Sequence, residues 1–163
     1  MIPQLQGGGP TALFDAVYST CQHPIFRDRE PNRSALIVFS DGEDNLSLRD
    51  VDQAIATAQS NGISVYTVSV HRRREETPGD RVLRKLAEAT GGQDFVVKEE
   101  RQTQAALSTI ATDLRAYYLL YYTPVKDSGS REFRHVRVVP TREGGPILRY
   151  RDGYYTVPVA GDR

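Results

Sequence analysis

The sequence has little of several features that would define a function directly. Its single cysteine, Cys21, excludes an intrachain disulfide framework and a zinc site built from several thiolates. Lys plus Arg and Asp plus Glu both total 21, so no global field would recruit nucleic acid or an acidic membrane surface. No apolar run approaches the roughly 18 residues that a membrane-spanning helix needs. The 163 residues nevertheless suffice for one domain with a real core.

Chemistry-bearing residues are also scattered. His23, His71 and His135 are expected in a connection, at a strand end and in the tail, so no imidazole metal cluster is predicted. No glycine-rich phosphate loop stands between a predicted strand and a helix, and no Ser or Cys has a positioned His. Residues 1–9 lack the basic start and apolar centre of a signal peptide. The sequence therefore offers no ready-made catalytic or nucleotide site.

The most informative stretch is residues 35–45, ALIVFSDGEDN. An unbroken apolar run followed by a polar turn predicts a strand that is buried on both faces, as in a parallel sheet. In open α/β sheets, ligands bind at the loops that leave the carboxyl ends of the strands, so Asp41 is the first candidate functional residue. In an alternative interpretation, residues 40–45 are only a turn that caps the next helix. Glu43 and Asp44 would then be acids at a helix start rather than outer charges of a site.

Helices and strands are predicted to alternate before residue 117. Apolar residues at helical spacing between Leu13 and Tyr18 predict a helix that Thr11 caps, and Cys21 is expected to be a small helical core residue. Leu48 is expected to begin the apolar face of the next helix. The alternation indicates a parallel sheet covered on both sides. The predicted helices are 11–22, 48–60, 80–90 and 102–116, and the predicted strands are 35–40, 63–70 and 94–98.

The pattern changes in the last third of the chain. Short segments with partly alternating polarity, separated by glycine-containing turns, predict an antiparallel appendage of three or four strands. These segments are 117–123, 134–140, 147–151 and 154–157. Arginines alternate there with tyrosines and valines, which is more typical of a sheet with one wet face than of a nucleic-acid surface.

Five segments are informative together: 7–17 (GGGPTALFDAV), 35–45, 114–124 (LRAYYLLYYTP), 133–138 (FRHVRV) and 149–155 (RYRDGYY). They resemble the von Willebrand factor type A family, and more closely its bacterial branch often labelled the von Willebrand factor A-related acidobacterial domain. The resemblance implies a doubly wound, Rossmann-like α/β fold truncated to its last three parallel strands, with a C-terminal antiparallel β appendage. It divides the chain into a partial type A domain (1–116), a β extension (117–157) and a tail (158–163).

The resemblance also implies a metal site, the metal-ion-dependent adhesion site. In the family, Mg²⁺ or another divalent cation is held by an Asp-x-Ser-x-Ser loop, a threonine and an aspartate, and a carboxylate from a partner protein fills an open position. Thr11 and Asp41 match the last two ligands. The first loop has no match, because 127–130 (DSGS) lacks the spacing and suits a hairpin turn. Two ligands are few for an ion that prefers six oxygens, so we expect weak metal binding or none.

Two classes of function follow. The first is a non-enzymatic adhesion or interaction module that binds a protein partner. The second is a hydrolase or phosphotransfer domain with Asp41 as the nucleophile, although Glu43 stands where a haloacid-dehalogenase-type site needs a second aspartate. The resemblance further suggests an exported bacterial protein of which this chain is a fragment, with Met1 not the biological start. A missing first strand would leave residues 35–40 as an unprotected sheet edge prone to self-association.

Overall fold

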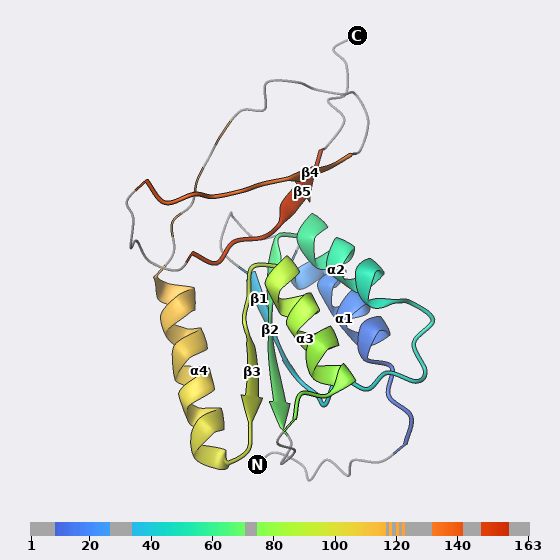
Figure 1. The fold of residues 1–163 in the computed structure, drawn as a ribbon. Coiled ribbons are helices and arrows are strands. Elements are labelled where there is room, and N and C mark those ends of the chain that lie inside the picture. The colour runs from blue at the N-terminus through green and yellow to red at the C-terminus, as the bar shows by residue number, and fades with distance from the viewer. Residues whose placement is uncertain are drawn as a thin grey trace.

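The computed structural model describes residues 9–26, 34–70, 75–116, 118, 120, 122, 132–141 and 148–156. A three-stranded parallel sheet in the order β1-β2-β3 forms its centre (Figure 1). The strands are β1 (Ser34–Phe39), β2 (Ile63–Val70) and β3 (Asp94–Val97). In register, Leu36 of β1 pairs with Val65 of β2, and Val68 pairs with Phe95 of β3. The predicted α/β fold with a parallel sheet is confirmed.

Helices cover both faces of this sheet, as the alternation predicted (Figure 1). One face carries α1 (Leu13–Cys21), α2 (Val51–Ser60) and α3 (Pro78–Ala89), and the other carries α4 (Glu100–Arg115). A short 3₁₀ helix, Pro24–Phe26, follows α1. No helix within the described ranges is both long and apolar enough to cross a membrane.

The core has two parts because β2 contributes side chains to both faces. Val65 and Leu86 belong to the cluster under α1, α2 and α3, whereas Tyr66 and Ile110 belong to the cluster under α4. Cys21 is fully buried in the first cluster, as predicted for a small helical core residue. Burial raises the pKa of its thiol to about 11, which keeps the thiol protonated at neutral pH.

Local signals define the starts of three helices. Asp50 caps α2 and Thr77 caps α3, each in a reciprocal capping box. Glu99 precedes α4 and makes no side-chain cap bond, but its N–H donates to Gln102 Oε1 at 3.2 Å. Glycine marks the helix ends: Gly62 and Gly91 follow α2 and α3 with φ values of 66° and 77°. These starts and ends agree with the predicted helices to within a few residues, except at the start of α2.

Two local predictions were wrong. Leu48 does not begin the second helix: it lies in the preceding loop, is 93% exposed, and α2 starts only at Val51. β1 is not buried on both faces either, because Ile37 and Phe39 are 36% and 53% exposed. The apolar run indicated a sheet interior correctly, but β1 has a neighbour on one side only among the described strands.

The C-terminal part contains a small antiparallel hairpin at the amino-terminal end of the sheet, beside α2 (Figure 1). It pairs β4 (Phe133–His135) with β5 (Gly153–Tyr155). The described residues show these two strands rather than three or four. Residues 118, 120 and 122 belong to no strand, and the other residues of 117–123, with 142–147 and 157, lie outside the described residues.

Candidate functional site at the carboxyl edge of the sheet

Asp41 lies two residues after the end of β1, at the carboxyl end of this strand. The carboxyl edge of the sheet is opposite the β4–β5 hairpin (Figure 1). The Asp41 side chain is exposed, and its Oδ1 atom accepts a hydrogen bond from the Glu43 N–H at 3.1 Å. Ser40 Oγ accepts a second bond from the Gly42 N–H at 3.0 Å, and Gly42 has a φ of 79°. The segment is therefore a tight turn that presents a carboxylate to solvent.

This turn is packed backbone to backbone against the start of α3. A Cβ atom added to Gly42 would lie 2.3 Å from the Gly79 carbonyl oxygen. A Cβ atom added to Gly79 would lie 2.0 Å from the Asp41 carbonyl oxygen. Only glycine fits at both positions, so the position of Asp41 is set by contacts with α3 as well as by β1.

Thr11 is tied to the same loop. Its backbone N–H donates to Asn45 Oδ1 at 2.7 Å, and its carbonyl oxygen accepts from the N–H groups of Asn45 and Leu46 at 3.0 and 3.1 Å. Thr11 does not cap α1 as predicted: Ala12 occupies the cap position and makes no side-chain cap bond. Both candidate residues, Thr11 and Asp41, are thus exposed and belong to segments joined by this loop.

Asp44 supplies the missing cap of α1 from a distance of thirty residues in sequence. Its Oδ2 atom accepts from the Phe14 N–H at 2.9 Å and from the Ser47 hydroxyl at 2.6 Å, and its Oδ1 atom accepts from the Ser47 N–H at 3.0 Å. Burial tends to raise the pKa of Asp44, but these hydrogen bonds outweigh it and hold the pKa below its usual value. Asp44 therefore does mark a helix start, but that of α1 instead of α2.

Asp15 completes the attachment of the loop to α1. Its Oδ2 atom accepts from the Leu48 N–H at 3.0 Å, and its Oδ1 atom lies 3.0 Å from Nη1 of Arg49. The guanidinium of Arg49 also stacks over the Tyr18 ring, 3.9 Å from its centroid. The Leu48 N–H and then Arg49 hold the pKa of Asp15 below its usual value. Sequence analysis missed these residues because their partners lie more than thirty positions away.

The residues at this edge do not fit a complete divalent-cation site. Asp15 and Asp44 direct their oxygens at backbone N–H groups and at Arg49 or Ser47, which leaves Thr11 and Asp41 as the matching ligands. Nowhere in the described ranges do three or more His, Cys, Asp or Glu side chains converge in a way that could hold a metal. Two oxygen ligands are well short of the six that Mg²⁺ prefers.

Two hollows lie away from this edge. One, of about 270 Å³, is bordered by α2, α3 and the β4–β5 hairpin, and the other, of about 370 Å³, follows β3 and α4. Neither is lined by Thr11 or Asp41. Asp41 is therefore presented on a surface and not inside either hollow, a placement that suits contact with a macromolecule better than enclosure of a small substrate.

The chain is similar to a solved structure and to a protein family. An uncharacterized membrane-spanning protein from Vibrio fischeri, with a known crystal structure, is 24% identical, with a TM-score of 0.44. The comparison covers 54% of this chain and 50% of that chain, about half of its length. None of the curated proteins matches the chain. The von Willebrand factor type A domain family, however, matches residues 2–112, well over half of the sequence. The protein therefore belongs to the von Willebrand factor type A domain family.

Proposed function

We propose that this chain is a non-enzymatic protein-binding module whose Thr11 and Asp41 belong to an incomplete metal-ion-dependent adhesion site. Membership of the type A family supports an interaction module. The observation that supports assigning the site to this edge is the pair of hydrogen bonds that Asn45 and Leu46, in the loop after Asp41, donate to the Thr11 carbonyl oxygen. These bonds tie Thr11 to the loop that follows Asp41, and both side chains are exposed.

The surrounding contacts explain how the surface would serve binding. Asp44 of the loop accepts from the Phe14 N–H of α1, and Asp15 of α1 accepts from the Leu48 N–H of the loop, so both restrain the loop. The glycine contact with α3 restrains its first turn. A restrained loop loses less conformational freedom on binding than a free one, so more of the interaction energy appears as affinity. Because the chain supplies few ligands, a cation at this surface would take its other oxygens from water and from a carboxylate of the partner.

A selection from displayed peptides tests this proposal. Peptides rich in Asp and Glu should be retained by the wild-type protein in Mn²⁺, and should be lost in a chelator and in Asp41→Ala. Glu43→Ala is the matched control, because it removes an exposed acid from the same turn. If the peptides were still retained in the chelator and by the Asp41→Ala variant, the assignment of the site to this edge would be overturned.

The enzyme interpretation has one supporting observation, the exposed Asp41 carboxylate at the end of β1. A generic phosphatase substrate such as p-nitrophenyl phosphate tests it directly. We expect no turnover above background from the wild-type protein. Turnover that disappears in Asp41→Asn but persists in Glu43→Gln would favour the enzyme over the binding module.

A further inference from the structure

The outer edge of β1 has the properties of an unfinished sheet. Within the described part of the chain, β1 pairs with β2 on one side and with no strand on the other. Its sequence, SALIVF, contains neither charge nor proline, the residues that usually protect an edge strand from pairing. Ile37 and Phe39 are large and exposed on this strand. The edge therefore offers backbone hydrogen-bonding groups together with apolar side chains.

The two faces of β1 are covered unequally. Leu36 and Val38 pack against the cluster under α1, α2 and α3. Ala35 borders the cluster under α4, and alternation places Ile37 and Phe39 on this same face. Among the described elements, α4 packs mainly on β3 and β2, at the end of this face away from β1 (Figure 1).

We propose that β1 pairs antiparallel with β1 of a second copy of this chain, around a two-fold axis through Ile37, to make a continuous six-stranded sheet. Side chains directly opposite each other in an antiparallel pair lie on the same face, so the axis must pass through a residue. Centred on Ile37, the pairing sets Phe39 opposite Ala35 and Leu36 opposite Val38. Ile37 then lies directly opposite Ile37 of the second copy.

This register is self-complementary, which is why a second copy is the occupant. Every residue from 35 to 39 faces an apolar partner, the large Phe39 faces the small Ala35, and Ser34 faces Ser40. A register centred on Leu36 would set Ser34 opposite Val38, and one centred on Val38 would set Ser40 opposite Leu36. The absence of charge on β1 also removes like-charge repulsion between two identical edges.

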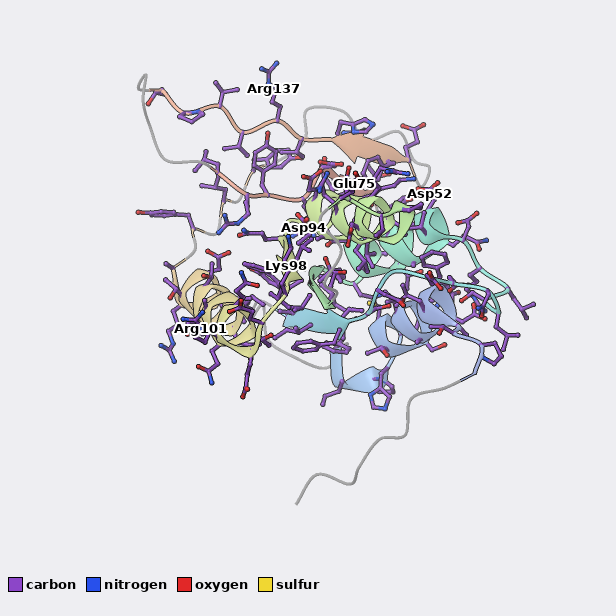
Figure 2. The ribbon with its side chains drawn as sticks, turned by 60° about the horizontal axis from the view of Figure 1, so that its bottom comes forward. Asp52, Glu75, Asp94, Lys98, Arg101 and Arg137 are labelled. Carbon is purple, nitrogen blue, oxygen red and sulfur yellow. The ribbon has the colours of Figure 1, made fainter. Side chains whose placement is uncertain are left out.

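The opposite edge of the sheet provides a contrast. β3 begins with Asp94, whose Oδ2 lies 3.4 Å from Nε of Arg84, and Lys98 follows its last residue (Figure 2). Val96 is 40% exposed, close to the value for Ile37. β3 thus exposes one apolar side chain to the same extent as Ile37 of β1, but it carries charges that discourage pairing, so Val96 supplies matched control variants.

Cysteine cross-linking tests the register. Cβ atoms of directly opposite residues in antiparallel strands lie about 4.5–5.5 Å apart, near the range that a disulfide spans. Under mild oxidation Ile37→Cys should form a covalent dimer, and an equimolar mixture of Ala35→Cys and Phe39→Cys should form the mixed dimer in preference to either homodimer. Wild-type protein, in which Cys21 is buried, and Val96→Cys should remain uncross-linked.

Association without cross-linking is measured by light scattering. The wild-type chain should be dimeric, and Ile37→Lys should be monomeric because two lysines would lie directly opposite each other, whereas Val96→Lys should stay dimeric. Circular dichroism checks that each variant is folded. A folded monomeric wild type, or equal cross-linking of Ile37→Cys and Val96→Cys, would overturn the proposal, and neither result bears on Asp41.

Discussion

The two ends of the parallel sheet are held together in different ways. At the carboxyl edge, the loop after β1 is attached to α1 by the carboxylates of Asp15 and Asp44. At the amino edge, close backbone contacts dominate: a Cβ atom on Gly92 would lie 1.9 Å from the Val65 carbonyl oxygen, and one on Gly91 would lie 2.8 Å from the Arg151 nitrogen. The carboxyl edge, which also has the close contact between Gly42 and Gly79, should therefore respond to charge and pH as well as to side-chain volume, and the amino edge mainly to side-chain volume.

The largest expected effect is at the amino edge. Gly92→Ala should lower the free energy of unfolding by about 3 kcal/mol, because the backbone of β2 must move to admit the methyl group. Gly62→Ala is the control: its nearest neighbour is 3.9 Å away, so only the positive φ opposes the change, at about 1–2 kcal/mol. Urea denaturation measures both. Equal losses in the two variants would contradict the close-packed description of this edge.

A smaller effect is expected from removing the distant cap of α1. Asp44→Ala leaves the Phe14 N–H without its carboxylate and should lower the free energy of unfolding by about 1 kcal/mol. Glu43→Ala changes the neighbouring acid, whose side chain is exposed, and should change stability very little. Denaturant titration of the pair decides whether the cap stabilises the fold.

The carboxyl edge should also weaken in acid. A carboxyl group whose pKa is lowered by folding contributes stability above its unfolded pKa of about 3.9 and loses that contribution as the pH falls through its folded pKa. Asp15 and Asp44 both have lowered pKa values. Thermal melts below about pH 4 should therefore show a steeper loss of stability for the wild type than for Asp15→Asn with Asp44→Asn. If the wild type and the double variant lost stability equally as the pH falls, these two carboxylates would not be what stabilises the carboxyl edge.

The smallest expected effect concerns the metal. Calorimetric titration with Mg²⁺ or Mn²⁺ should show weak heat or none, because Thr11 and Asp41 leave most of the coordination to water. Micromolar affinity that disappears in Asp41→Ala would show that further ligands converge at the carboxyl edge.

Prediction from sequence was most accurate where the signals were local. The apolar spacing of α3, its Thr77 cap and the positive φ at Gly91 are all encoded within one helix and its borders. Prediction from sequence was wrong at the start of α1, where Thr11 was expected to be the cap. The true partner, Asp44, is brought there only by the path of the chain through β1. Capping by a distant residue leaves no spacing signature in the sequence.

The candidate site was only partly predictable for the same reason. Asp41 was identified from its place after an apolar strand, and Thr11 from a family resemblance. The sequence did not predict the backbone hydrogen bonds between Thr11 and the loop after Asp41. It also did not predict that Asp15 and Asp44 attach this loop to α1. Carboxylates that look equivalent in sequence were assigned different partners by folding.

The sequence by itself determined the order of helices and strands, the parallel sheet and the family, because periodicity, capping and turn residues act within a few positions of each other. Tertiary structure decided which of those strands is exposed and which acids remain accessible. Ile37 and Phe39 belong to a run that is apolar enough for a sheet interior, and they are exposed because β1 has one described neighbour. The burial of a strand depends on which strands and helices lie beside it, and these neighbours are set by the assembled fold.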